Sequence, residues 1–139
     1  MKVYINRLND EFLFEAEGQH KKKVLIDSSA PETVQGSSPM ELLLMAVGSC
    51  NAIDIVSILK KQRQSIHSYK VEVEGERKEV KQARPFSDIH VTVILEGEID
   101  PAKAKRAAQL SFEKYCSVSM TMDNCVNITY DVVLNDHKI

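Results

Sequence analysis

Alternating apolar and polar residues at the start of the chain predict a small antiparallel sheet. Residues 2–6 and 11–17 place apolar side chains at every second position, and a polar turn separates the two runs. A third short strand is predicted at residues 24–26. The segment that follows, residues 27–37, contains Ser, Gly and Pro and is predicted to be an irregular, mobile loop.

The longest pattern in the chain predicts one central helix over residues 38–63. Ser38 is a favourable N-cap, Pro39 suits the first helical position, and Glu41 completes a capping box. Residues 42–47 are apolar on every side of such a helix. We therefore expect other parts of the chain, or another subunit, to cover both of its faces.

Strict alternation returns in the second half of the chain and predicts two strands, at residues 65–76 and 89–95. Each strand would bury one face and expose the other to solvent. His90 falls on the polar face, so a solvent-facing histidine is favoured over a catalytic base.

The rest of the chain predicts two helices and a strand. An aspartate followed by a proline starts a helix at residues 101–115, and a short helix follows at 117–123. Alternation at 126–134 predicts the last strand, and residues 136–139 read as a fraying tail. This order of elements predicts an α+β fold in a single domain, residues 1–139.

Composition and charge limit the possible functions. The chain has 139 residues, 43% of them hydrophobic and 27% charged, which fits one globular domain with a core of its own. A net charge of −2 gives no reason to expect nucleic-acid binding. No run of eighteen apolar residues occurs, and the first residues read as a strand rather than a signal peptide. We expect a cytoplasmic protein that binds neither nucleic acid nor a membrane.

The three cysteines, Cys50, Cys116 and Cys125, form no CxxC motif and have no histidine at metal-ligand spacing. A structural zinc site is therefore not expected, and an odd number argues against a disulfide framework. Inert buried thiols and redox-active thiols both stay open as readings. We interpret Cys125, beside the last strand, as a buried structural thiol.

Two segments carry a resemblance to a known family. They are SPMELLLMAVGSCNAIDIVSILKK at residues 38–61 and KYCSVS at residues 114–119, each with one cysteine in its context. Together with the order of elements, they resemble the OsmC/Ohr family of thiol-dependent peroxide-handling proteins, and within it the OsmC-like subgroup sometimes called YhfA-like. The resemblance covers essentially the whole chain.

The resemblance implies an OsmC-like fold, with antiparallel sheets wrapped around central helices in an intertwined homodimer. Each of two interface sites would contain Cys50 and Cys116. In this family the cysteine matching Cys50 attacks a small hydrophobic peroxide, and the one matching Cys116 resolves the sulfenic acid to a disulfide. An external dithiol then reduces the disulfide. No metal or organic cofactor is implied.

The sequence also departs from the organic-peroxidase members of this family. They carry a glutamate ten positions before the reactive cysteine, where this chain has Met40. Glu41 is adjacent, but one residue along a helix rotates a side chain by about 100°. Arg7 is the candidate for the family's early-loop arginine, with a solvated turn residue as the alternative. Asp54, one turn after Cys50, would accept hydrogen bonds or pair with a cation from a partner subunit.

Two readings stay open for Met40, Met45 and Met120: an apolar ligand pocket around the cysteines, or flexible core filler. The paired cysteines favour an OsmC-like thiol redox protein that reduces organic hydroperoxides. The alternative is a binding module of the same fold that holds a small apolar or electrophilic ligand at the dimer interface. A purely structural stress protein leaves the cysteine pairing unexplained.

Overall fold

The computed structural model of the chain describes residues 1–30 and 32–139. These residues form two compact units, residues 1–43 and residues 44–139. The longest helix, α1, begins in the first unit and continues into the second. The single domain expected for residues 1–139 stays a prediction.

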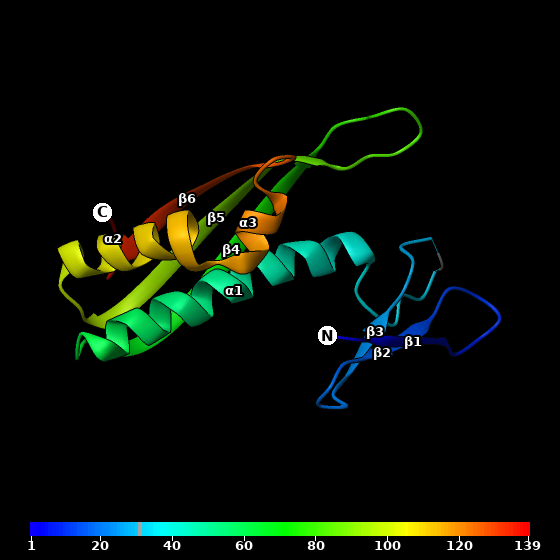
Figure 1. Ribbon diagram of the computed structural model, residues 1–139, viewed down its shortest axis with the longest axis horizontal. Helices are drawn as coiled ribbons and strands as arrows, with labels where there is room; N and C mark the ends of the chain where they lie inside the picture. The colour runs from blue at the N-terminus through cyan, green and yellow to red at the C-terminus, as the bar shows by residue number, and fades with distance from the viewer. Residues whose placement is uncertain (31) are drawn as a thin grey trace. The chain divides into compact units, whose positions relative to one another are not determined.

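The first unit is built on a three-stranded antiparallel sheet (Figure 1), as the alternation predicts. Its strands are β1 (Tyr4–Arg7), β2 (Phe14–Glu17) and β3 (Lys23–Ile26), in the order β1-β2-β3. Strands of four residues bury little surface, and only Leu13 among the large apolar side chains of residues 1–30 is buried. Several other apolar side chains of this unit are exposed, namely Tyr4, Ile5, Leu8, Phe12, Val24 and Leu25.

The segment between β3 and α1 is irregular, as predicted, with Pro31 lying outside the described residues. The buried carboxylate of Asp27 organises its two ends, accepting hydrogen bonds from the backbone N–H groups of Ser28 (2.7 Å) and Gln35 (3.0 Å). A single bridge joins Ile26 to Ser37 just before the helix. These contacts tie the approach to α1 to the edge of the sheet.

Helix α1 (Pro39–Lys61) begins where the sequence predicts. The Ser38 backbone N–H donates to Glu41 Oε2 over 2.7 Å, and the Glu41 N–H donates to Ser38 Oγ over 3.3 Å. These reciprocal bonds are the predicted capping box. They also lower the pKa of Glu41, chiefly through the hydrogen bond from the Ser38 backbone.

The second unit contains a four-stranded sheet of order β4-β5-β6-β7 (Figure 1). Its two long strands, β4 (Ser65–Arg77) and β5 (Phe86–Glu98), pair antiparallel, with Val71 opposite Val93. Val91, Val93 and Leu95 are fully buried, so the predicted inward face of β5 is confirmed.

The expectation of purely antiparallel sheets is wrong at one place, because β5 and β6 (Asn127–Leu134) run parallel. Ile89 lies opposite Ile128, and Leu95 lies opposite Leu134. The helical segment between these strands returns the chain to the beginning of β5 before β6 starts. Parallel neighbours require such a crossover.

The predicted fraying tail is also wrong. Asn135 and Asp136 adopt positive φ angles of 47° and 65° and reverse the chain. His137 and Lys138 then form β7, which pairs antiparallel with the end of β6. Lys138 Nζ lies 2.6 Å from Asp131 Oδ2, so a side-chain ion pair adds to the backbone pairing.

The crossover contains α2 (Pro101–Leu110), a π-helical turn η1 (Ser111–Tyr115) and α3 (Ser117–Met122). Asp100 caps α2 by accepting from the Lys103 N–H over 3.0 Å. The predicted helix at 101–115 is therefore helical throughout, but its last turn widens. There the Cys116 N–H bonds to the Ser111 carbonyl, five residues back, over 2.9 Å.

Helices α1 and α2 lie along the same face of the β4–β6 sheet (Figure 1). At Gly48 helix α1 approaches β4 closely, because a Cβ added there would lie 2.7 Å from a methyl group of Val73. The stacked rings of Phe112 and Tyr130, with centroids 4.2 Å apart, join η1 to β6. The core of this unit lies between these helices and the sheet.

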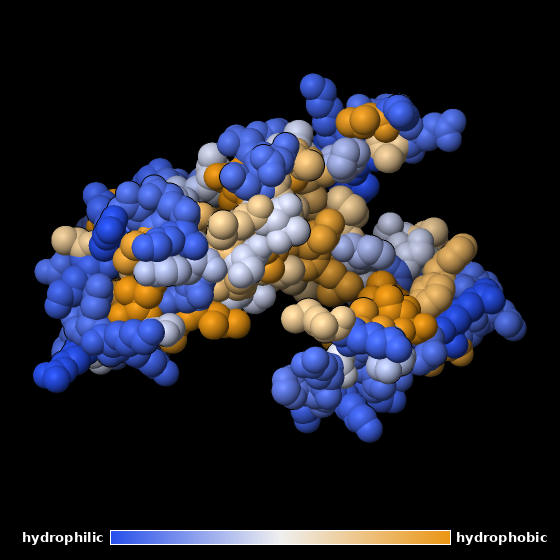
Figure 2. All heavy atoms as spheres, in the orientation of Figure 1, coloured by the Kyte–Doolittle hydropathy of each residue, from blue (hydrophilic) through white to orange (hydrophobic). Residues whose placement is uncertain are grey.

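Within one chain, only one face of α1 is covered. Val47, Asn51, Ile55 and Leu59 are fully buried, whereas Ile53 is 70% exposed. By length and composition alone, α1 is the one helix among the described residues that could cross a membrane. Apolar side chains reach the surface visible in Figure 2. The expectation that both faces are covered is not met within the single chain.

Candidate active site

Cys116 lies at the junction between η1 and α3 and is fully buried. Its backbone is extended there, with ψ at 101°, because the π-helical turn ends and the next helix has not begun. Ser119, one turn later, gives the sulfur two hydrogen bonds. Its backbone N–H lies 3.3 Å from Cys116 Sγ, and its hydroxyl Oγ lies 3.1 Å away.

Asn51 connects this sulfur environment to α1. Its side-chain amide donates to the Val47 carbonyl over 2.8 Å and to Ser119 Oγ over 3.1 Å. The Asn51 Oδ1 atom faces the other way and accepts from the Ser111 hydroxyl over 2.9 Å. All three polar side chains, from Asn51, Ser111 and Ser119, are buried, so each hydrogen bond removes a desolvation cost.

Cys50 occupies the position just before Asn51 and is half-buried. Both thiols are free, and Cys50 lies near enough to Cys116 to influence the pKa of the Cys116 thiol. Burial raises the pKa of Cys116, and the nearby Cys50 raises it further. The two hydrogen bonds from Ser119 oppose this and lower the Cys116 pKa, but the net direction is upward.

The local sequence explains why these groups meet. Asn51 is followed one turn later by Asp54, and both face the crossover helix. The π-helical turn holds Ser111 beside them, so its hydroxyl also lies 3.2 Å from Asp54 Oδ2. Single π-helical turns often occur at functional sites. A continuous set of hydrogen bonds therefore runs from Ser111 through Asn51 and Ser119 to the Cys116 sulfur, and the single Ser111 hydroxyl hydrogen is shared between Asn51 Oδ1 and Asp54 Oδ2.

The other candidate supporting residues have partners of their own. Asp54 accepts a hydrogen bond, which is one of its two expected roles. Glu41 is used in the capping box of α1. The Arg7 guanidinium donates to the Glu11 carbonyl over 2.9 Å and to the Asp10 carbonyl, and thereby closes the β1–β2 turn.

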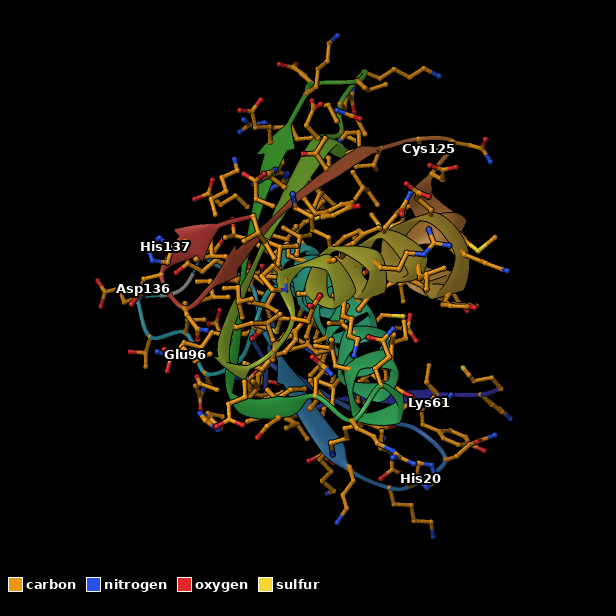
Figure 3. All side chains as sticks on the ribbon, turned by 90° about the vertical axis from the view of Figure 1, so that its left-hand side faces the viewer. His20, Lys61, Glu96, Cys125, Asp136 and His137 are labelled. Atoms are coloured by element: carbon orange, nitrogen blue, oxygen red, sulfur yellow. The ribbon has the colours of Figure 1, made fainter. Side chains whose placement is uncertain are left out.

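Most of the methionines named above, and the third cysteine, are more exposed to solvent than Cys116. Met45 and Met120 are exposed, and Met40 is half-buried. The interpretation of Cys125 as a buried thiol is wrong, because it is exposed at the end of the turn that follows α3 (Figure 3). Its backbone N–H bonds to the Met122 carbonyl, and this tight turn leaves the side chain on the surface.

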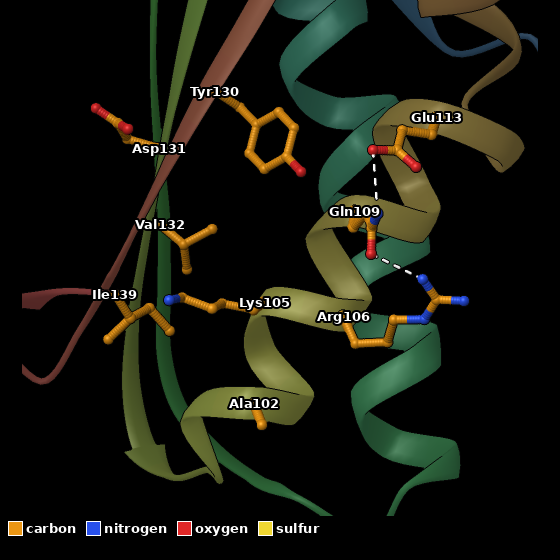
Figure 4. A pocket seen from close by; sticks show the side chains of 9 residues that line it. All are labelled: Ala102, Lys105, Arg106, Gln109, Glu113, Tyr130, Asp131, Val132 and Ile139. Atoms are coloured by element: carbon orange, nitrogen blue, oxygen red, sulfur yellow. Dashed lines mark hydrogen bonds between the residues drawn. The ribbon is translucent and has the colours of Figure 1, made fainter.

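Two sizeable cavities lie in the second unit. One of about 560 Å³ is adjacent to the hydrogen-bonded set, with Asp54 and Tyr115 in its wall. Its remaining lining residues are Ser57, Ile58, Lys61, Gln62 and Leu110. The other, of about 590 Å³, is a charged groove between α2 and β6 (Figure 4). In that groove Gln109 bridges Arg106 and Glu113, and neither cysteine takes part.

Metal ligation has no support in the described residues. Among residues 1–30 and 32–139, no three His, Cys, Asp or Glu side chains gather as metal ligands would. The reactive groups at this site are the thiols of Cys50, which is half-buried, and Cys116, which is buried.

Comparison with known proteins identifies the family. The model of the OsmC-like protein family matches residues 31–131. The chain belongs to the OsmC-like family. Protein YhfA of Escherichia coli K12 is 42% identical to this OsmC-like chain over 125 residues, which are 88% of the chain and 90% of YhfA.

Solved structures show the same OsmC-like fold. An OsmC-like protein from Mycoplasma pneumoniae superposes with a TM-score of 0.81 at 15% identity, covering 96% of this chain and 95% of that one. The organic hydroperoxide resistance protein OhrB of Bacillus subtilis gives a TM-score of 0.63 at 17% identity, covering 94% and 96%. The predicted α+β class and the predicted family are both confirmed.

Three residues of the OsmC-like site had no role assigned from the sequence. Ser111 and Ser119 read as ordinary helix positions, and Asn51 as one polar residue in an apolar helix. The available signal was Asn51 itself, since an amide that follows the apolar stretch of residues 42–47 and is buried must find partners. The identity of those partners depends on how α1 and the crossover pack.

Proposed function

We propose that this OsmC-like protein is a cysteine-based peroxidase that reduces organic hydroperoxides. The observation that carries the proposal is the hydrogen-bonded link from Asn51, the residue after Cys50, through Ser119 to the buried Cys116 sulfur, with Cys50 near enough to influence the Cys116 pKa. The family supports a redox role at a general level, and a structural neighbour is an organic hydroperoxide resistance protein. We place its action in the cytoplasm, where thiols are kept reduced.

The proposed reaction has three balanced steps. The Cys50 thiolate attacks the distal peroxide oxygen, the O–O bond breaks, and the alcohol leaves after taking up a proton. The Cys116 thiolate then attacks the Cys50 sulfenic sulfur, forming the disulfide and releasing hydroxide, which becomes water. Finally an external dithiol transfers two electrons and two protons and restores both thiols.

The assignment of these roles rests on the difference between the two thiols. Cys116 is fully buried and has a raised pKa, so at neutral pH its sulfur is mainly a protonated thiol. Cys50 is more accessible, which suits the residue that meets the peroxide first.

We further propose that the working form is an intertwined homodimer. The exposed apolar side chains of α1 and of the first unit need a cover that the single chain does not provide. Met45 and Met120, both exposed, would then line an interface pocket for a small hydrophobic peroxide, together with Met40.

Intact mass spectrometry tests the peroxidase. One equivalent of cumene hydroperoxide should remove two hydrogens per wild-type chain, and a dithiol should restore the starting mass. Cys116→Ser should instead accumulate a sulfenic acid that dimedone traps, whereas Cys50→Ser should stay unmodified.

The matched control is Cys125→Ser, which removes the exposed thiol and should behave as the wild type. Oxidation that persists in Cys50→Ser would contradict the proposal. So would a wild-type chain whose mass is unchanged by the peroxide.

A second candidate is a binding module that holds a small apolar or electrophilic ligand. It is favoured by one observation: position 40 is Met, and both Glu41 and Arg7 are hydrogen-bonded within their own cap and turn. Native mass spectrometry of the purified protein separates the candidates. A retained ligand together with peroxide-inert thiols would favour the binding module.

A further inference from the structure

The direction of the hydrogen bonds around Asn51 can be assigned from chemistry alone. The Val47 carbonyl can only accept, so the amide nitrogen of Asn51 must face it. That orientation places Asn51 Oδ1 toward the Ser111 hydroxyl. It also uses both amide hydrogens, one on the Val47 carbonyl and one on Ser119 Oγ.

This assignment determines where the Ser119 hydroxyl hydrogen goes. Ser119 Oγ accepts from Asn51, so its own hydrogen is free for another acceptor. The acceptor within reach is the Cys116 sulfur, 3.1 Å from Ser119 Oγ. The Ser119 backbone N–H points at the same atom over 3.3 Å. Two donors therefore converge on Cys116 from one residue.

A sulfur that accepts two hydrogen bonds is prepared to carry negative charge. Burial and the neighbouring Cys50 act in the opposite direction, and Cys50 is the titratable group that raises the Cys116 pKa. The carboxylate of Asp54 reaches the set only through Ser111. The two hydrogen bonds from Ser119 thus partly offset the rise in the Cys116 pKa that burial and Cys50 cause.

We infer that Asn51 and Ser119 are positioning residues, which direct the Ser119 hydroxyl onto Cys116 Sγ and so ready Cys116 to attack the Cys50 sulfenic acid. The inference deepens the proposed function, on which the resolving role of Cys116 rests. Asn51 orients Ser119, and Ser111 orients Asn51. Neither Asn51 nor Ser111 needs to contact the peroxide.

The first test measures the Cys116 thiolate directly and needs no peroxide. In the Cys50→Ser/Cys125→Ser background Cys116 is the one cysteine, and the ¹³C chemical shift of its labelled Cβ against pH reports its thiolate without interference from the four tyrosines. Ser119→Ala should raise the measured Cys116 pKa by about one to two units, because a hydrogen bond to a charged group is lost. Ser119→Thr keeps the hydroxyl and should restore the wild-type value.

Asn51→Leu gives an independent, uncharged variant of nearly the same shape. It removes the amide that donates to Ser119 Oγ, so the Ser119 hydroxyl is no longer directed onto the sulfur. The Cys116 pKa should again rise. The inference is overturned if the pKa is unchanged in both Ser119→Ala and Asn51→Leu while circular dichroism shows both variants folded.

The second test follows the resolution step in the otherwise intact chain. In Ser119→Ala, a rise of about one unit in the Cys116 pKa makes the thiolate fraction about tenfold smaller at neutral pH. Each thiolate is then about threefold more nucleophilic, so disulfide formation should slow about threefold. The rate should also reach its plateau at higher pH. Ser117→Ala, an exposed serine of the same helix, is the matched control and should match the wild type.

The two tests separate the inference from the proposed function. If peroxide leaves the wild-type thiols unchanged, the peroxidase fails, while the thiolate titration still decides whether Ser119 acts on Cys116. If peroxide forms the disulfide but Ser119→Ala resolves at the wild-type rate across the pH range, the positioning role is wrong and the peroxidase stands.

Discussion

The surroundings of Cys116 have opposing effects on its pKa. Burial beside Cys50 favours its neutral thiol, and the two donors of Ser119 favour its thiolate. The net raised pKa means that the folded chain holds the Cys116 proton at a pH where the unfolded chain has lost it. Protonation and folding are therefore linked at this residue.

This linkage predicts how stability changes in alkali. The contribution from Cys116 is fully present below its unfolded pKa, about 8.5, and is lost as the pH rises through the higher folded value. Urea unfolding of the wild type and of Cys116→Ser, measured from neutral to alkaline pH, tests this. The wild type should lose more stability than the variant over that range. Parallel losses in the two proteins would contradict the prediction.

Helix α1 illustrates how a single element serves capping, packing and chemistry at different positions. Its start is set by Ser38 and Glu41, its contact with β4 by Gly48, and its chemistry by Cys50 and Asn51. Gly48 lowers the intrinsic helix propensity, but it lets the helix approach the sheet closely.

Replacing this glycine should destabilise the protein. In Gly48→Ala the new Cβ would lie 2.7 Å from Val73 Cγ2, and the stiff valine side chain cannot easily move away. Overpacking of about 1–3 kcal/mol should exceed the gain of about 1 kcal/mol in helix propensity. We expect a net loss of about 1 kcal/mol in urea unfolding.

Two further variants make that prediction specific. Gly18→Ala, whose Cβ would meet nothing within 4 Å, should change stability by less than about 0.5 kcal/mol. Combining Gly48→Ala with Val73→Ala should relieve the clash, so the double variant should be more stable than the sum of the single losses. Strict additivity would show that the Gly48 contact is not the cause.

Several large apolar side chains of α1 and of the first unit are exposed in the single chain. Met45 is 52% exposed and Ile53 is 70% exposed on α1, and the first unit buries few of its apolar side chains. Isolated apolar residues on a surface are ordinary, but groups of them indicate an interface. The proposed homodimer would cover them.

Light scattering of the purified protein tests this assembly. The wild type should have twice the mass of one chain. Ile53→Glu places a charge on the exposed apolar face of α1 and should shift the protein toward the monomer. Lys60→Glu, at the exposed polar end of the same helix, is the control for the charge and should stay dimeric. A wild-type monomer would contradict the dimer.

Local patterns in the sequence were sufficient for the capped start of α1, the inward face of β5, the α+β class and the family. Each of these depends on residues two to four positions apart, or on a short segment with its own signature, so neighbours along the chain decide them. The parallel pairing of β5 with β6 depends on how the crossover packs. The hydrogen bonds of Asn51 depend on that packing too, because Ser111 lies 60 positions and Ser119 lies 68 positions further along the chain. No local pattern encodes such a distance, so folding alone brings Asn51 to Ser111 and Ser119, and with them Cys50 to Cys116.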